Sequence, residues 1–286
     1  MPASRYPADS PARLLRDALE PVAAHAFWSI ATRQAMAQLG LSGTSVYVRG
    51  RAAALGAAAA PVVISAFAWF EPGLIESAYH AGPAEVTPED LSRTRSTTTG
   101  ASLRAVRPDA DASWLADKLT AATAAGASPG RCLFSARRAQ TPPSDPFERL
   151  WWASETLRDH RGDSHIAAAT VAGVGAVEMN ILTELALGGQ LGRYTATRGW
   201  SPAAIEEAAQ ALHGRGWLSG RNLTTAGQDA RTSIEHDTDN LDAPVIAAIG
   251  DDLPRVLAEL ETWGRACIDA NAFPRDQFKN CAYVLL

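Results

Sequence analysis

The sequence predicts a mainly α-helical protein with one short β-ribbon near its C-terminal end. Three observations support this prediction. Apolar residues recur at helical spacing along most of the chain. Several of these segments begin with a capping residue followed by proline, as Ser201-Pro202 does. Two short runs within residues 216–224 are separated by a tight turn, which is typical of a β-hairpin.

The composition is typical of a soluble globular protein. The chain has 286 residues, of which 47% are hydrophobic, so it can form one large domain or two ordinary ones. Its longest apolar run, Ala57–Phe70, is too short to cross a bilayer and is interrupted by Pro61. The first residues hold three prolines and no continuous apolar stretch, so we expect no signal peptide and no membrane partner.

The three cysteines, Cys132, Cys267 and Cys281, show no spacing that is typical of a metal site. An odd number of widely spaced cysteines favours reduced thiols, and we therefore expect a cytoplasmic protein. The sequence contains no HExxH or GxSxG motif and no GxGxxG motif after a strand. We expect neither a metal nor an organic cofactor.

The N-terminal half is expected to be a helical domain, residues 13–127, that follows a flexible arm, residues 1–12. Its helices are predicted at Pro11–Leu19, Phe27–Leu39, Pro61–Phe70 and Ser113–Ala125. Gly40 follows the second of these helices, at a position where glycine ends many helices. Outside the last helix, residues 81–146 have an irregular apolar pattern, so we expect little regular structure there.

A linker, residues 128–146, is expected before a C-terminal domain, residues 147–286, because "TPPSDPF" breaks any regular pattern. Asp145 and Pro146 then form an N-cap and first-turn pair, which starts a helix that reaches about His160. The second half is therefore expected to begin with a well-marked helix.

Ionisable residues of mixed kind crowd the next segment, Arg158–His165. Gly162 is expected to end the first helix, and Asp163 or Ser164 to cap the next one, which runs to about Gly173. A further helix, "AVEMNILTELALGG", ends at a pair of glycines. The sequence therefore predicts that the charged cluster joins two helices.

The order of elements after this point is that of a winged helix-turn-helix. Ser201-Pro202 starts a helix whose apolar residues have helical spacing. Those residues are Ala204, Ile205, Ala208, Ala209 and Leu212. Two short strands, "GWLS" and "RNLT", come next, and Thr224 or Thr225 begins a long helix that runs to about Leu241. Short helices, a helix, a small β-ribbon and a long helix in this order predict a winged helix.

The segment "ALHGRGWLSGRNLTTAGQDA" resembles the "L…RGL…LT..G" signature of MarR-type winged-helix proteins. This resemblance covers about Gly192–Leu241 and implies a winged helix-turn-helix fold. We also consider the N-terminal half as a degenerate copy of this module, because "AMAQLGLSG" parallels "ALHGRGWLSG".

A wider resemblance covers most of the chain. The segments "ALEP", "AMAQLGLSG", "GRAAALG", "WFEPGLI", "LRDHRGDSHIAA", "RGW" and "LTTAG" occur in the order found in a large actinobacterial family of helix-turn-helix-like proteins. That family commonly has "LREHRGDGH", which Asp163 and His165 match and in which Ser164 replaces a glycine. It tends to have a histidine soon after "LEP", where this chain has Ala23 and, nearby, His25. The resemblance implies a helix-turn-helix-like fold and no particular activity.

Charge disfavours DNA as the partner of the predicted winged helix. The net charge of the chain is −5, whereas nucleic-acid binders usually present a basic face. The helix in the recognition position carries Glu206, Glu207 and Gln210, so two carboxylates would approach a polyanion. If DNA is bound nevertheless, the basic residues placed to contact it are Arg198, Arg215 and Arg221.

The charged cluster is the candidate catalytic site. A histidine can move a proton near neutral pH, and a carboxylate bonded to it fixes its tautomer. We therefore expect His165 to act as general acid and base, with Asp163 as its orienting partner. Arg161 is expected to clamp an anion with its forked donors, and His160 to be a second proton carrier. The alternative is that Asp163 only caps a helix and that the arginines form surface ion pairs.

A ligand pocket is expected near the cluster, because helices made mainly of small residues carry a few large aromatic ones. The predicted lining residues are Trp28, Trp69, Trp152, Arg158 and His25. The alternative is that the tryptophans fill an ordinary core and that His25 is a structural histidine.

These observations lead to two hypotheses of function. The first is a small-molecule-binding protein on a winged-helix scaffold, which acts as a cofactor-independent enzyme of specialised metabolism on an apolar or aromatic substrate. The alternative is a MarR-like, ligand-responsive DNA-binding regulator in which the same pocket senses an effector. Both hypotheses allow a homodimer.

Overall fold

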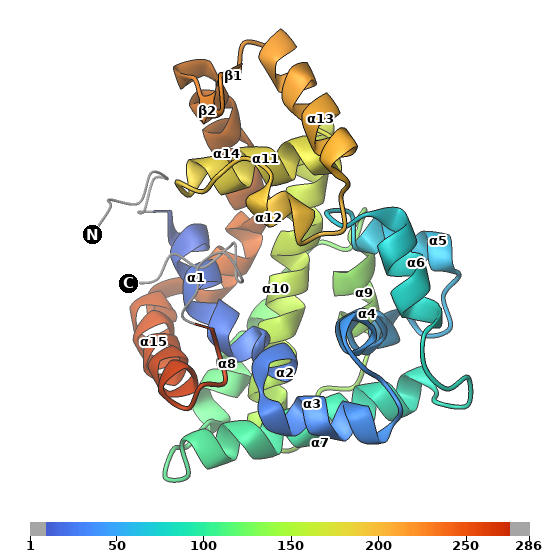
Figure 1. Ribbon diagram of the computed structural model, residues 1–286. Coiled ribbons are helices and arrows are strands. Elements are labelled where there is room, and N and C mark those ends of the chain that lie inside the picture. Colours follow the sequence, from blue (N-terminus) through green and yellow to red (C-terminus); the bar gives the residue numbers. More distant parts are fainter. Residues whose placement is uncertain (1–9, 275–286) are drawn as a thin grey trace.

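One long helix, α10 (Pro146–Val171), runs through the centre of the computed structural model, and the other helices surround it (Figure 1). The structure describes residues 10–274. The helices before α10 are α1 (Pro11–Ala23), α2 (His25–Trp28), α3 (Ile30–Gln38), α4 (Thr44–Ala52), α5 (Ala60–Ala66), α6 (Pro72–His80), α7 (Pro88–Val106), α8 (Ser113–Thr123) and α9 (Cys132–Arg138). The elements after it are α11 (Ala176–Ala186), α12 (Arg193–Ala196), α13 (Pro202–Gly214), β1 (Leu218–Ser219), β2 (Asn222–Leu223), α14 (Thr225–Ile249) and α15 (Leu253–Asp269). Short 3₁₀ turns occupy Ala53–Leu55 and Gly250–Asp252.

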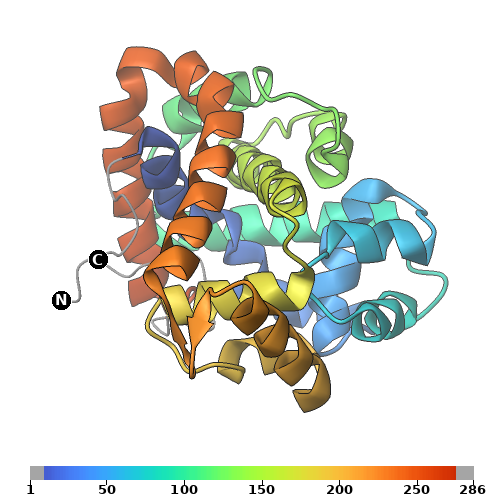
Figure 2. The ribbon, with the colours of Figure 1, turned by 90° about the horizontal axis from the view of Figure 1, so that it is seen from above.

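The surroundings of α10 come from both halves of the chain. It packs against α1, α7, α8 and α9 on the N-terminal side of the sequence and against α14 on the C-terminal side. Seen from above, α14 and α15 lie to one side of α10, and α5 and α6 lie to the other (Figure 2). The proposed division into two domains stays a prediction, and the packing shows that α10 belongs structurally to both regions.

The helix α10 begins where the sequence predicts but does not break at Gly162. The Asp145 carboxylate accepts hydrogen bonds from the backbone N–H groups of Phe147 and Glu148, at 2.9 and 3.2 Å, and so caps the helix. The predicted helix start at Asp163 or Ser164 is wrong, because α10 continues to Val171. Burial of most of this helix outweighs the penalty of about 1 kcal/mol for an internal glycine.

Two helices lie in the region that was expected to be irregular. The first, α7, starts with a capping box in which Thr87 and Asp90 satisfy each other's backbone N–H groups. Its buried face has helical spacing but includes two polar residues, Arg95 and Thr99. Because these residues hide the apolar pattern, the sequence does not reveal the helix. The second, α9, lies inside the predicted linker.

The winged-helix order is confirmed. Ser201 caps α13 by accepting the N–H of Ala204 at 3.2 Å, and Thr224 caps α14 by accepting the N–H of Gly227 at 3.1 Å. The strands β1 and β2 pair antiparallel, with Leu218 opposite Leu223. The helix α14 extends past the predicted end at Leu241 to Ile249. The observed fold class is therefore mainly α with a small ribbon, as expected.

Separate apolar clusters stabilise the main body and the winged helix. The cluster of the main body joins α1, α8, α10, α14 and α15 around Trp151, Trp152 and Trp263. The cluster of the winged helix joins α11, α13 and β1 to the C-terminal end of α10 through Ile181, Leu212 and neighbouring residues. This second cluster fixes α10 to the winged helix.

The described part of the N-terminal half contains helices but no strand, so a degenerate winged helix there would lack its ribbon. No single helix within residues 10–274 is long and apolar enough to span a membrane. The helices α10 and α11 meet that criterion only as a pair, by length and composition, and they are bent by 107° relative to each other.

Candidate functional site

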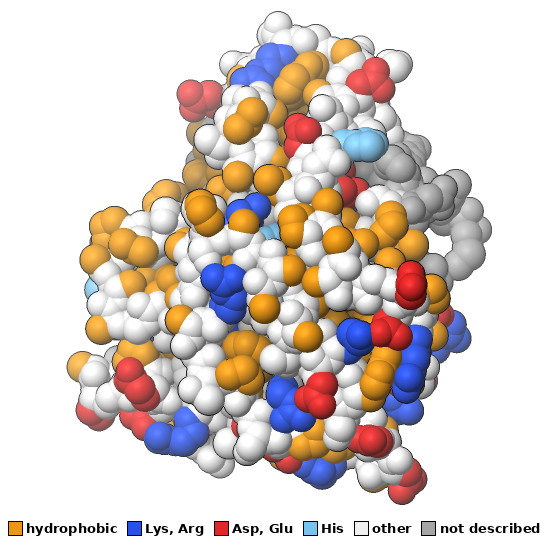
Figure 3. Space-filling view, turned by 180° about the vertical axis from the view of Figure 1, so that it is seen from behind, with side chains coloured by type: hydrophobic (Ala, Val, Ile, Leu, Met, Phe, Trp, Pro, Cys, Tyr) orange, Lys and Arg blue, Asp and Glu red, His pale blue; other side chains and the backbone are white. Residues whose placement is uncertain are grey.

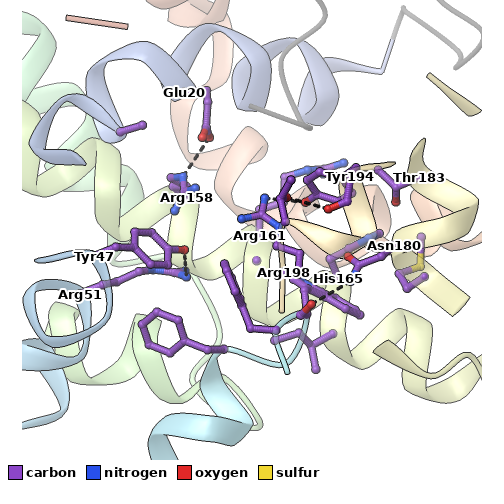
Figure 4. Close-up of a pocket in the computed structure, with 18 of the residues that line it drawn as sticks. Glu20, Tyr47, Arg51, Arg158, Arg161, His165, Asn180, Thr183, Tyr194 and Arg198 are labelled. Atoms are coloured by element: carbon purple, nitrogen blue, oxygen red, sulfur yellow. Dashed lines mark hydrogen bonds and ion pairs between the residues drawn. The ribbon is translucent and has the colours of Figure 1, made fainter. Parts of the chain in front are cut away.

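A cavity of about 630 Å³ lies against the middle of α10, between the helical main body and the winged helix. Its walls come from α1, α2, α4 and the segment between α5 and α6 on one side, and from α11, α12 and α14 on the other. Figure 4 shows arginine, tyrosine and histidine side chains that reach it from these elements. This volume is in the range of small-molecule sites.

Aromatic rings form much of the cavity wall. The aromatic lining residues are Phe27, Trp28, Tyr47, Phe67, Trp69, Phe70 and Tyr194. The Tyr47 ring packs edge-on against Phe27 and Phe67, with ring centroids 4.9 and 5.5 Å away. Edge-to-face packing of this kind fixes the rings and leaves flat apolar surfaces. The cavity is therefore suited to a flat, apolar body.

Arginines form most of the charged part of the wall. The arginines that line the cavity are Arg13, Arg16, Arg51, Arg158, Arg161, Arg198 and Arg231, and the carboxylates are Glu20, Asp163 and Glu235. Several of these arginines also form ion pairs with carboxylates behind the wall, so their positive charges are not all available to a ligand. The position of each pair decides where an anion can bind.

At the Tyr47 end, three guanidinium groups converge on one phenol. Arg51 donates to the Tyr47 hydroxyl at 3.3 Å and to Asp159 at 2.7 and 3.1 Å. Burial would raise the pKa of Tyr47, but the positive charges of Arg51, Arg158 and Arg198 outweigh it and lower this pKa. This end of the cavity therefore stabilises negative charge.

On the side of the cavity formed by α14, Arg161 is held by carboxylates of that helix. It donates to Asp242 and Glu235, each at 3.0 Å, and pairs with Asp239 at 2.6 Å. Its fork is thus occupied by the protein itself, which argues against the predicted role as an anion clamp. In the structure, Arg161 ties α10 to α14.

The predicted pair of Asp163 and His165 does not form. The Asp163 carboxylate instead accepts the backbone N–H of Phe134 in α9, at 3.1 Å. Burial, with a contribution from Asp159, raises the pKa of Asp163 to about 6. Asp163 and His165 are two residues apart on one continuous helix and therefore point in different directions. The prediction that Asp163 orients His165 is wrong.

Thr238 of α14 orients His165. The His165 Nδ1 atom lies 3.0 Å from the Thr238 hydroxyl, and that hydroxyl donates to the carbonyl of Ile234 at 2.7 Å. Because the hydroxyl proton is used on Ile234, Nδ1 carries the imidazole hydrogen and Nε2 keeps its lone pair. Burial lowers the pKa of His165 to about 3, so the ring is neutral at neutral pH.

Three predicted site residues lie away from the cavity. His160 is buried, does not line the cavity, and its Nδ1 atom lies 2.7 Å from Asp242 of α14. His25 is buried against Ser102, 2.9 Å from its hydroxyl, and Trp152 belongs to the main core. In contrast, Trp28, Trp69, Arg158, Arg161, Asp163 and His165 do line the cavity. Their roles in function stay predictions.

Sequence reasoning missed two prominent lining residues, Tyr47 and Arg51. They are four residues apart in α4, so their side chains share one helix face. An aromatic residue and an arginine at this spacing are a weak signal, and nothing in the sequence places α4 beside α10. Asn180 and Arg231, from α11 and α14, were missed for the same reason.

The residues chosen for DNA contact fall into two groups. Arg198 lies over the rings of Phe70 and Tyr194 and lines the cavity. Arg215 and Arg221 are exposed, although each donates to a backbone carbonyl. The exposed residues of α13 include Glu206, Glu207 and Gln210. Seen from behind, basic and acidic side chains are interspersed on the surface (Figure 3).

No three His, Cys, Asp or Glu side chains gather within residues 10–274 in a way that could hold a metal ion. The model of a family described as a helix-turn-helix family matches residues 12–274. No curated protein and no solved structure matches the chain.

Proposed function

The chain belongs to a helix-turn-helix family, and from this premise we propose that it is a ligand-responsive DNA-binding protein. In this proposal the cavity binds a small anionic molecule with a flat apolar body, and the winged helix beside it contacts DNA. Family membership favours this regulator over the enzyme hypothesis, and it favours nucleic acid as a partner in spite of the acidic net charge. The finer resemblance to MarR-type proteins and the homodimer remain part of the proposal.

The observation that carries the proposal is the position of the cavity between the main body and the winged helix. A ligand there touches α10 and α4 on one side and α11 and α12 on the other. A ligand can shift the balance between two arrangements of a protein only if it binds them with different affinity. In this proposal, a ligand that touches both walls binds the arrangement that keeps the two regions together more tightly than one in which they separate.

Direct hydrogen bonds support coupling across the cavity. The backbone carbonyl of Trp69 accepts from the Asn180 amide at 2.8 Å and from the Trp200 indole at 3.1 Å. The carbonyl of Arg198 accepts the N–H of Glu71 at 2.9 Å. Trp200 directly precedes Ser201, the N-cap of α13. A ligand that displaces Trp69 would therefore disturb the start of α13.

The charges of the winged helix favour contacts with phosphates over contacts with bases. Arg193, Arg215 and Arg221 are exposed around the ribbon and the turn before α13. The carboxylates of Glu206 and Glu207 repel the DNA backbone wherever α13 enters a groove. We therefore expect weak, strongly salt-dependent binding to duplex DNA.

Two measurements test this proposal. Benzoates, cinnamates and naphthoates at 1 mM should raise the thermal midpoint, because a ligand that binds the folded state stabilises it. Duplexes selected from a random pool should bind in gel-shift assays, and the stabilising acids should change that affinity. Arg215→Ala with Arg221→Ala should lower duplex affinity at least tenfold, whereas Arg33→Ala on the distant, exposed α3 should not.

If the protein binds no duplex under any of these conditions, the proposal that it is a DNA-binding regulator is wrong. If no aromatic acid raises its thermal midpoint, the proposal that the cavity binds such a ligand is wrong.

One observation favours the enzyme as a second candidate. His165 lines the cavity with its Nε2 lone pair available to accept a proton, although burial lowers its pKa to about 3 and makes it a weak base. If the protein converts its ligand, His165→Asn should abolish turnover and leave binding of the unreacted acid largely unchanged. Unchanged turnover in this variant would exclude His165 as the base.

A further inference from the structure

We infer that the cavity binds a monoanionic carboxylic acid in one orientation, with the carboxylate at Arg158 and Tyr47 and a hydroxyl or amine at Nε2 of His165. The inference rests on the proposed ligand binding and adds to it the chemistry and direction of the ligand. Two observations support it. The two ends of the cavity offer different groups to a ligand, and the surface of α10 between them is open at Gly162.

Arg158 offers a pair of donors to the cavity. Its Nε atom donates to Glu20 at 2.9 Å, and its side chain is 23% exposed. Within the described residues, neither Nη atom of Arg158 has an acceptor. Figure 4 shows the Arg158 side chain between Glu20 and Tyr47. Two parallel N–H donors on a planar group match the two oxygens of a carboxylate.

Tyr47 adds a third donor at the same place. Its hydroxyl oxygen accepts from Arg51, and its hydroxyl hydrogen has no acceptor in the described part of the chain. Arg51 is itself fixed by Asp159, so the phenol is held in position. The Tyr47 hydroxyl and the Arg158 fork can therefore bind the same anion.

Positive charge exceeds negative charge at this end of the cavity. Ion pairs join Arg51, Arg95 and Arg137 with Glu155 and Asp159, and a separate ion pair joins Arg158 with Glu20. These groups leave one positive charge, and Arg198 adds another beside Tyr47. The excess favours an anion, and the two Nη donors of Arg158 match the two oxygens of a carboxylate.

The other end offers an acceptor. His165 donates through Nδ1 to Thr238, and Nε2 has no partner within the described residues. Its ring lies 5.5 Å from the Trp69 ring, centroid to centroid, so the acceptor borders an aromatic wall. A ligand hydroxyl or amine can donate to Nε2, while a second carboxylate there would meet a lone pair and the carboxylate of Glu235.

Gly162 leaves an open surface between the two ends. Arg158, Gly162 and His165 follow at intervals of four and three residues, so they lie on one face of α10. Seven residues span about 10 Å along a helix. A Cβ atom at Gly162 would meet only Arg51 Nη2, at 3.8 Å. The backbone of α10 is thus open to the cavity at Gly162, and a flat body can lie against it there.

The test uses a set of naphthalene probes in calorimetric titrations. The probes are 6-hydroxy-2-naphthoate, 2-naphthoate, 6-hydroxy-2-naphthamide and 6-hydroxy-2-naphthyl phosphate. We expect 6-hydroxy-2-naphthoate to bind at least tenfold more tightly than each of the others. The comparison with the amide tests whether the anion is needed, the comparison with 2-naphthoate tests whether the hydroxyl donor is needed, and the comparison with the phosphate tests the preference for a carboxylate.

Two variants test which residue binds each end of the probe. Arg158→Gln should weaken 6-hydroxy-2-naphthoate at least tenfold and leave the amide within twofold. His165→Asn keeps a partner for Thr238 and should weaken 6-hydroxy-2-naphthoate but leave 2-naphthoate within twofold. Arg33→Ala on α3 should change none of these affinities.

Two substitutions of Gly162 test the open surface of α10. Gly162→Ala should raise the thermal midpoint of the free protein, because alanine is a better helix former than glycine. Gly162→Leu should weaken every probe at least tenfold without lowering that midpoint, since the side chain enters the cavity. A lower midpoint or unchanged probe affinity in Gly162→Leu would overturn the role of this surface.

The outcomes separate the two proposals. If the probes bind but Arg158→Gln and His165→Asn affect all of them equally, the orientation is wrong and the ligand site stands. If no naphthalene probe and no other aromatic acid binds, the proposed function itself fails.

Discussion

At His165, one ring nitrogen is committed to the protein and the other faces the cavity. Thr238 cannot donate to the imidazole, because its hydroxyl already donates to the Ile234 carbonyl. The charged groups that face the ring are Glu235 and Arg231 of α14, Arg161 of α10 and Arg13 of α1. Burial and the three arginines disfavour a proton on Nε2, and Glu235 only partly offsets them.

This environment predicts how stability depends on pH. The pKa of His165 is about 3 in the folded protein and near 6.5 when unfolded, so the unfolded state binds more protons below pH 6.5. Stability is therefore lost as the pH falls through that value. Between pH 7.5 and 5, the native protein should lose about 2 kcal/mol more of its unfolding free energy than His165→Asn. Urea unfolding at the two pH values checks this, and equal losses would contradict it.

Single residues also show what the sequence could predict about the site. The sequence predicts that Trp28, Trp69 and Arg158 line a pocket, and all three do. It does not predict Tyr47 there, because the place of Tyr47 depends on how α4 packs beside α10 and not on any local pattern. The sequence pairs Asp163 with His165 because it indicates a helix end at Gly162. In the structure α10 continues through this position, and Asp163 accepts the N–H of Phe134 instead.

Among the elements, the turn between α11 and α12 depends on one buried carboxylate. Glu184 accepts the backbone N–H groups of Gly192, Tyr194 and Thr195 and the hydroxyl of Thr195. These four hydrogen bonds replace the hydrogen bonds to water that the carboxylate loses when it is buried. This carboxylate therefore fixes the corner that leads into α13.

Replacing Glu184 should weaken this corner. Glu184→Gln places an amide N–H₂ among four donors and should lower the unfolding free energy by about 2–3 kcal/mol. Glu178→Gln is a matched control, because Glu178 accepts a single N–H at the exposed start of α11, and its loss should be below about 1 kcal/mol. Chemical denaturation measures both, and equal effects would show that burial of Glu184 is unimportant.

The sequence predicted elements well where their boundaries depend on local caps. Ser201 and Thr224 accept backbone N–H groups three residues ahead, so the winged helix could be located without knowing its neighbours. The sequence does not predict α7, because buried Arg95 forms an ion pair with Glu155 of α10, 60 positions away. A polar residue stabilised by such a distant partner interrupts the apolar pattern from which helices are recognised.

At the scale of the whole molecule, the distribution of charge on the winged helix is expected to determine how tightly it binds DNA. Glu206 and Glu207 are exposed on α13, and Arg215 and Arg221 lie beyond its C-terminal end. The protein therefore combines phosphate-attracting and phosphate-repelling groups on one module, and we expect the acidic residues to limit its affinity.

Neutralising these carboxylates should strengthen duplex binding. Glu206→Gln with Glu207→Gln should raise the affinity for duplex DNA about threefold to tenfold at 0.1 M salt, because two repulsive charges are removed. Glu76→Gln with Glu85→Gln makes the same change in net charge at exposed positions outside the winged helix and should have a smaller effect. Fluorescence anisotropy with a labelled duplex checks this, and equal effects would place the DNA contact elsewhere.

The continuity of α10 has a consequence for how movement could occur. One unbroken helix carries the main core at its start, the cavity along its middle and the winged-helix cluster at its end. Because α10 is unbroken, it links the main core directly to the winged-helix cluster. The chain turns by 107° after Val171, through Gly173 in the left-handed region. A movement of the winged helix therefore has to change both this short connection and the apolar cluster that packs the winged helix against the end of α10.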